Sequence, residues 1–242
     1  MYKKAFSKFL GEMRDYIVLV LSMSGYVPKH ATILRTIAIS FVLFFSLYLS
    51  LFQPLNSQLA LIYFLVAEIL YIGFIYLVLP ENGCRHWFIK KWGSEEKGYL
   101  AFEAILGFLF LNNVISIAYI TSSTSGDVFD FFPRGILFVI VLIMSSVGLI
   151  TKILSAKVAS IDIYYWKDMF LGRKIRDFIV MGPYKYFSNP MYGIGQLQSY
   201  AIALWYGSIP GLCVAALNQC LVFSFFFLEE KKFIKKVYNK NR

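Results

Sequence analysis

Charged residues are scarce in this sequence. Asp, Glu, Lys and Arg make up 16% of its 242 residues, whereas 58% are hydrophobic and 19% are aromatic. Soluble domains carry roughly 25% charged residues, so the composition excludes an ordinary soluble protein and predicts an integral membrane protein. Without a soluble domain to carry a groove-reading element, we expect no nucleic-acid partner.

Cysteine and histidine are also few. The three cysteines, Cys84, Cys213 and Cys220, have no CxxC spacing and no cluster of histidines beside them. Disulfide frameworks and structural zinc sites need such patterns. We therefore expect free thiols, no disulfide framework and no metal site.

A cleavable signal peptide is not evident. The apolar run YIVLVLSMSGY is short, follows Glu12, Arg14 and Asp15, and has no clear small-residue cleavage site. We interpret residues 1–30 as an interfacial amphipathic arm.

Long apolar runs are what the sequence has in abundance. Four of them reach the roughly 18 residues that cross a bilayer, and a fifth region, 191–228, is too long for one span. The turn chemistry of WYGSIPGL, with Gly207, Pro210 and Gly211, divides that region into a helical hairpin. The sequence predicts an all-α membrane protein with about six transmembrane helices, at 36–53, 57–80, 100–120, 134–155, 191–206 and 210–228.

Basic residues alternate between the predicted loops. Of 24 Lys and Arg, all but Arg134 lie in the first 35 residues, in 81–98, in 152–190 or after Glu230. By the positive-inside rule both termini are cytoplasmic, in a bacterial inner membrane or the endoplasmic reticulum. The net charge of +10 would attract anionic lipid headgroups on that side.

A few polar residues fall inside predicted spans. Glu68 lies deep in a span and could face a substrate, whereas Glu103 is near a span end, where we expect it to snorkel. For Asn112 and Asn113 we expect hydrogen bonds between helices.

The densest cluster of turn residues is MGPYKYFSNPMYGIG, residues 181–195. Gly182 and Pro183 predict a turn, while Asn189 and Pro190 fit the N-cap and first residue of a helix that enters the bilayer. Three tyrosines could be interfacial aromatics: Tyr184, Tyr186 and Tyr192.

Glu229 and Glu230 end the last predicted span, in FSFFFLEEKKF. The helix macrodipole disfavours carboxylates at a C-terminus. The pair is therefore either a charged boundary compensated by Lys231 and Lys232 or a functional pair.

Together, the pattern G-P-Y-x-Y-x-x-N-P-M-Y, the following hairpin and the Glu pair 37 residues beyond Tyr192 resemble the membrane-embedded methyltransferase superfamily. That superfamily comprises phospholipid N-methyltransferases and isoprenylcysteine carboxyl methyltransferases. The resemblance implies a cytoplasmic-side pocket for S-adenosylmethionine, with Glu230 and Asn189 as candidate catalytic residues. The implied cofactor-binding residues are Phe178, Ile179, Gly182, Pro183, Tyr184, Asn189, Pro190, Tyr192, Glu229 and Glu230.

The acceptor implied by the resemblance is a lipid amine. Asn-Pro-Met-Tyr, preceded by Ser188, is similar to the phosphatidylethanolamine N-methyltransferase branch, whereas many carboxyl methyltransferases have Arg-His before the proline. The short tail also lacks the G-x-x-Y-x-x-Y continuation of the carboxyl methyltransferases. The glycine-bearing segment of the phospholipid enzymes is matched only by Gly148.

Three alternatives stay open. The chain could be an isoprenylcysteine carboxyl O-methyltransferase, or an NADPH-dependent sterol reductase, although no Gly-rich dinucleotide fingerprint is present. A non-catalytic membrane scaffold would leave the spacing of the motifs to chance, and no inverted repeat suggests a transporter. The favoured organisation is an arm at 1–30, a four-helix membrane region at 31–155 and a methyltransferase core at 156–242.

Overall fold

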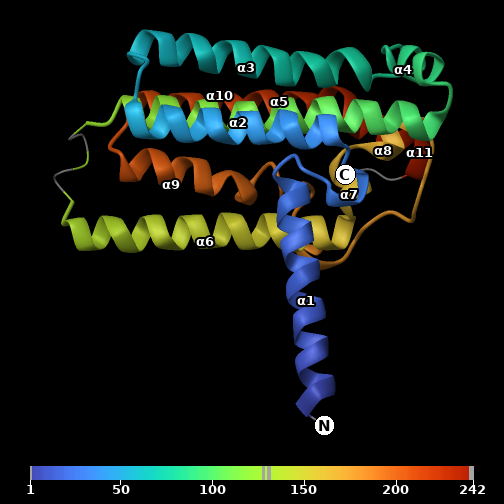
Figure 1. Ribbon diagram of the computed structural model, residues 1–242, viewed down its shortest axis with the longest axis horizontal. Coiled ribbons are helices and arrows are strands. Elements are labelled where there is room, and N and C mark those ends of the chain that lie inside the picture. The colour runs from blue at the N-terminus through green and yellow to red at the C-terminus, as the bar shows by residue number, and fades with distance from the viewer. Residues whose placement is uncertain (1, 127–128, 130–131, 240–242) are drawn as a thin grey trace.

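The computed structural model describes residues 2–126, 129 and 132–239, and its regular secondary structure there is entirely helical. The long helices, except the N-terminal one, lie side by side with nearly parallel axes (Figure 1). Five segments are long and apolar enough to cross a membrane, which confirms an all-α membrane protein. They are α2 (Ile33–Phe52), α3 (Ser57–Val78), α5 (Glu95–Ser123), α6 (Arg134–Ala159) and the continuous segment Ile209–Tyr238, which contains α10 (Ile209–Phe225) and α11 (Lys231–Tyr238).

Side-chain caps mark where four of these segments begin. In each case the side-chain oxygen of the residue before the helix accepts a hydrogen bond from a backbone N–H in the first turn, at 2.8–3.2 Å. Such bonds satisfy N–H groups that have no partner within the helix. The caps are Thr32, Asn56, Ser94 and Ser208.

Helix α5 is the centre of the bundle, since it packs against α2, α3, α9 (Leu197–Trp205) and α10. Its aromatic residues build the core at one end, where Phe102 stacks on Phe74 and Phe170 with ring centroids 5.5 and 5.1 Å apart. Tyr99 and Leu106 are buried beside them.

The predicted loops 81–98 and 156–190 contain short helices. They are α4 (Arg85–Trp92), α7 (Ile161–Tyr164), α8 (Lys167–Leu171) and the single 3₁₀ turn η2 (Gly182–Lys185). Helices α4, α7, α8 and α11 gather at the same end of the bundle (Figure 1). We call this the loop end.

The segment predicted to be a sixth span, 191–206, is only partly helical. Residues 191–193 form a turn, the 3₁₀ helix η3 covers Ile194–Gln196, and the helix α9 is confined to Leu197–Trp205. Nine residues rise roughly 14 Å, about half the thickness of the hydrocarbon. The prediction that the helix starts at Pro190 is wrong, because α9 begins only at Leu197.

Close packing explains the late start of α9. The N–H of Gly195 is bonded to the carbonyl of Pro190 at 2.9 Å, and a Cβ on Gly195 would lie 2.7 Å from the side chain of Lys152 on α6. A Cβ on Gly148 would lie 2.9 Å from the backbone nitrogen of Gln198. Glycine at these positions lets the chain lie against α6 before it becomes helical.

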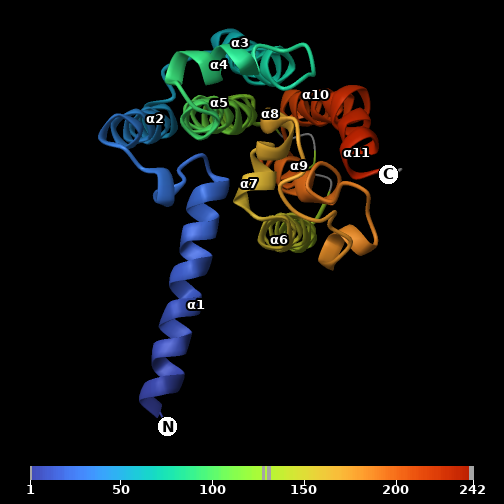
Figure 2. The ribbon, with the colours of Figure 1, turned by 90° about the vertical axis from the view of Figure 1, so that its right-hand side faces the viewer.

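Helix α1 (Tyr2–Met23) projects steeply away from the bundle (Figures 1 and 2). Its C-terminal end is attached to α7, because the hydroxyls of Tyr164 and Tyr165 donate to the carbonyls of Met23 and Ser22 at 3.3 and 2.6 Å. The interfacial role of the arm stays a prediction.

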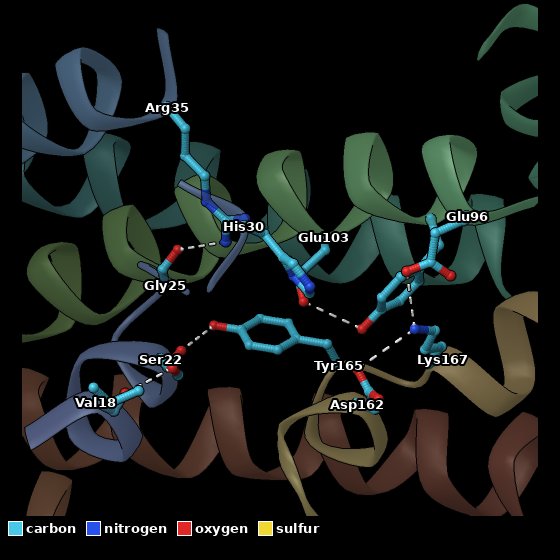
Figure 3. A network of polar contacts seen from close by, with 11 residues as sticks. Val18, Ser22, Gly25, His30, Arg35, Glu96, Glu103, Asp162, Tyr165 and Lys167 are labelled. Atoms are coloured by element: carbon cyan, nitrogen blue, oxygen red, sulfur yellow. Dashed lines mark hydrogen bonds and ion pairs between the residues drawn. The ribbon is translucent and has the colours of Figure 1, made fainter. Parts of the chain in front are cut away.

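Glu103 does not snorkel as expected. Its side chain is fully buried and its Oε2 lies 2.9 Å from Nη1 of Arg35 and 2.8 Å from Nδ1 of His30. The hydroxyl of Tyr99 donates to Oε1 at 3.3 Å, and Arg35 also donates to the carbonyl of Gly25 (Figure 3). A buried carboxylate needs such partners, and the N-terminal segment supplies two of them.

Replacing Glu103 by Gln is expected to lower the midpoint of thermal unfolding in detergent, measured by tryptophan fluorescence. Breaking a buried ion pair leaves the Arg35 charge uncompensated, at a cost of roughly 3–5 kcal/mol. The matched control is Asp177→Asn, which removes the exposed ion pair with Lys174 and should leave the midpoint nearly unchanged. Equal midpoints for Glu103→Gln and the unsubstituted protein would contradict this account.

Candidate functional site

A cavity of about 390 Å³ begins at the loop end and continues into the bundle. Its walls come from α3, α5, α6, α7, α8, the segment 176–192, α9 and the α10–α11 segment. Along α5 the lining runs from Leu106 to Thr121, a rise of roughly 22 Å. The volume lies within the range of small-molecule and cofactor sites.

Glu230 stands on a π-helical turn, Phe226–Glu230, between α10 and α11. The expectation that the last helix ends at the Glu pair is therefore wrong, since the helix continues to Tyr238. It continues because α11 has an apolar side, with Ile234 buried, and because the hydroxyl of Tyr238 donates to Asp168 on α8 at 2.9 Å. Turns of this kind occur often at functional sites.

The carboxylate of Glu230 is held at the cavity wall by two donors from other parts of the chain. The Nε1 of Trp166 and the hydroxyl of Tyr192 both donate to its Oε2, at 3.1 and 3.0 Å. Burial raises the pKa of Tyr192 well above its usual range, and the negative charge of Glu230 raises it further. Tyr192 is thus a neutral donor at physiological pH.

Trp166 reaches this position through an unusual backbone conformation. It has a φ of +51° between α7 and α8, in the left-handed region that bulky residues rarely adopt. Strained residues of this kind tend to cluster at functional sites. Its ring packs edge-on against Phe225 of α10, with centroids 5.6 Å apart.

The turn that carries Tyr192 is held by hydrogen bonds from two side chains. The Oδ1 of Asn189 accepts from the N–H of Tyr192 at 3.3 Å, which is the capping contact expected of Asn189 although no helix follows directly. From α10, the Nε2 of Gln219 donates to the carbonyls of Tyr192 and Gly193 at 2.8 and 3.2 Å. The turn is therefore positioned by α10 and by its own asparagine.

The structure brings six of the predicted cofactor-binding residues to the cavity wall. They are Phe178, Ile179, Tyr184, Asn189, Tyr192 and Glu230.

The other four do not line the cavity as the described residues define it. Gly182 makes a turn with a φ of +57° against Val158, and Pro183 follows it in η2. Pro190 supplies a carbonyl to Gly195. Glu229 lies 3.8 Å from Lys232, so the two carboxylates of the pair have different surroundings.

Sequence reasoning missed Trp166 and Asp168, which also line the cavity. Asp168 accepts from Tyr238 and from the N–H of Met169 at 2.9 Å each. Burial raises the pKa of its carboxyl, and these hydrogen bonds oppose the rise. The run IYYWKD in a long polar segment indicated that functional residues could lie there. Glu230 and Tyr238, which bond Trp166 and Asp168, lie more than 60 residues further along the chain, so the sequence did not show these contacts.

The residues at the loop end of the cavity fit the group that the resemblance implies. Glu230 can accept from hydroxyl or amino groups, and aromatic rings can pack on a purine and attract a cation. Trp166 and Tyr192 lie together there, with ring centroids 6.4 Å apart. The wall also holds Lys152 and Arg176, which can bind a carboxylate.

Comparison with known protein families agrees with the resemblance. Residues 136–241 match the model of the family described as phospholipid methyltransferase. The matched region runs from α6 to α11 and includes Asn189, Tyr192 and Glu230. The suspected relationship is thereby confirmed for this part of the chain. No curated protein and no solved structure matches the sequence.

Replacing Gln219 by Leu is expected to loosen the 189–193 turn. The substitution removes both bonds to the turn and the bond from Tyr200 to Oε1 of Gln219. Hydrogen–deuterium exchange of peptides covering 189–196 should become faster while exchange in α3 stays unchanged. The control is Cys220→Ser at the adjacent, exposed position; faster exchange of the turn in both variants would count against a specific role for Gln219.

Proposed function

We propose that the protein transfers a methyl group from S-adenosylmethionine to the amine of a phosphatidylethanolamine-type membrane phospholipid, in keeping with the match of residues 136–241 to the phospholipid methyltransferase family. The observation that carries this proposal is the carboxylate of Glu230. It is oriented by Trp166 and Tyr192 at the wall of a cavity that is lined from the loop end to the middle of the bundle.

Glu230 and the aromatic residues near it would hold the cofactor. When bound, S-adenosylmethionine supplies an electrophilic methyl group on a sulfonium cation. A carboxylate can accept several hydrogen bonds, so Glu230 can also accept from a ribose hydroxyl or an amino group of the cofactor. The rings of Trp166, Tyr192 and Tyr184 can pack on the adenosine.

The remaining task of the protein is to position the acceptor. A lipid amine attacks a methyl carbon only as the free base, so its ammonium form must first give its proton to water or to a carboxylate. A neutral acceptor of this kind requires orientation and exclusion of water rather than a covalent nucleophile. A cavity enclosed by α5, α9 and α10 suits both requirements.

We also propose that the loop end faces the cytoplasm, with both chain termini on that side. The support is the positive-inside rule applied to the 23 Lys and Arg outside the 126–134 connection. Helix α1 then lies along the membrane surface. Its steep angle to the bundle axis (Figure 2) agrees with that placement.

Glu230→Gln should weaken the binding of S-adenosylhomocysteine to the purified protein, measured by calorimetry. Each hydrogen bond to a charged acceptor contributes roughly 1.5–3 kcal/mol, which corresponds to a loss of about tenfold or more in affinity. Glu229→Gln is the matched control, since Glu229 lies toward Lys232 and outside the cavity wall. Equal affinities for the two variants would show that Glu230 does not bind the cofactor.

The acceptor is tested by incubating membranes that contain the protein with S-adenosylmethionine labelled on its methyl group, followed by separation of the lipids. Label is expected in mono- and further-methylated phosphatidylethanolamine, and Glu230→Gln membranes serve as the control. Label in a base-labile ester of a prenylated cysteine, with none in phospholipid, would identify a carboxyl methyltransferase instead.

A further inference from the structure

The inner part of the cavity is polar where it passes the middle of the bundle. Asn113 of α5 and Asn218 of α10 line it there, together with Gln198 and Ser199 from the start of α9. Asn218 precedes Glu230 by 12 residues on one continuous helical segment, a separation of roughly 18 Å along the axis. The cavity therefore has two polar regions at different depths.

Behind the inner region lies a buried carboxylate, Glu68 of α3. The Nδ2 of Asn113 donates to its Oε2 at 2.6 Å, and the Nδ2 of Asn218 donates to both of its oxygens at 3.0 and 3.2 Å. Asn218 also donates to the Oδ1 of Asn113 at 3.1 Å. All three side chains are at least 95% buried, and we call them the Glu68 cluster.

The Glu68 cluster lacks a positive charge. Among the described residues, Glu68 is bonded by the two amides and takes part in no ion pair. Glu103, the other carboxylate within a span, is paired with Arg35. An uncompensated carboxylate inside a membrane protein is costly and marks a functional site by default.

The side chain of Asn218, which lines the cavity, also has an acceptor available for a ligand. The Nδ2 of Asn218 is bonded to Glu68 and Asn113, but its Oδ1 receives no hydrogen bond from the described part of the chain. Tyr71, one helical turn after Glu68, also lines the cavity. A ligand with N–H donors and a positive charge would satisfy these groups.

We propose that the Glu68 cluster is the binding subsite for the ammonium headgroup of the methyl acceptor. The inference rests on the proposed function and names the part of the chain that selects the acceptor. A phospholipid ammonium offers the missing charge and up to three N–H donors, and its methylated products keep the charge. A carboxylate acceptor would be repelled by Glu68, so the cluster discriminates against the alternative substrate class.

The subsite is tested by titrating the full-length protein in detergent with short-chain dihexanoyl-phosphatidylethanolamine, with and without S-adenosylhomocysteine, by calorimetry. Glu68→Gln removes the charge at nearly constant shape, and Asn218→Leu removes the amide from a different helix. Each is expected to weaken lipid binding at least tenfold and to leave the affinity for S-adenosylhomocysteine within twofold. Dihexanoyl-phosphatidic acid, which has no amine, should bind much more weakly and respond to neither substitution.

The chain offers a matched control in Asn112→Leu. Asn112 is adjacent to Asn113 but does not line the cavity, and its Nδ2 donates to the carbonyl of Phe108 in its own helix. This variant should bind the lipid as the unsubstituted protein does. Circular dichroism establishes that each variant is folded, and the substitutions on α3 and α10 give two independent results.

Unchanged lipid affinity in folded Glu68→Gln and Asn218→Leu would overturn the subsite. Equal binding of the phosphatidic acid would overturn it as well, because the amine would then not be recognised. Failure of the unsubstituted protein to bind S-adenosylhomocysteine would instead contradict the proposed function. The lipid titration without S-adenosylhomocysteine keeps the two tests separate, because it measures lipid binding whether or not the cofactor analogue binds.

Discussion

Every backbone N–H and C=O within the hydrocarbon must find a partner inside the protein, and the site of this protein depends on how one segment meets that requirement. Helix α9 is too short to cross a membrane, so the chain before it is irregular. That irregular chain is tolerated because it lies between α6 and α10, where Gln219 bonds two of its carbonyls and Gly195 bonds another. Asn189, Tyr192 and Gln196 of that irregular chain line the cavity.

The segment from α10 to α11 joins the two polar regions of that cavity. Because its helix is continuous, Asn218 and Glu230 keep a fixed separation, and the π-helical turn adjusts the direction in which Glu230 points. Trp166 and Tyr192 then hold the Glu230 carboxylate from the opposite side. A ligand bound at the loop end and one bound at the Glu68 cluster would be aligned by the same helix.

The part of the chain outside the matched family region contributes more than membrane anchoring. Glu68 and Asn113 come from α3 and α5, which precede residue 136. The end of α1 receives hydrogen bonds from Tyr164 and Tyr165, the residues directly before Trp166. The backbone that positions Trp166 is therefore attached to the end of α1. Arg35, which pairs with Glu103, is bonded to Gly25 just after that end (Figure 3).

The sequence by itself determined the membrane class, four of the spans, the start of a fifth and the resemblance carried by Asn189, Tyr192 and Glu230, because apolar run length and motif spacing are local properties. Only the tertiary structure decided which polar residues meet. It separated Glu229 from Glu230 and buried Glu103 against Arg35. It also brought Trp166 to Glu230, because contacts between residues more than 60 positions apart depend on how the helices pack, and no local pattern encodes that packing.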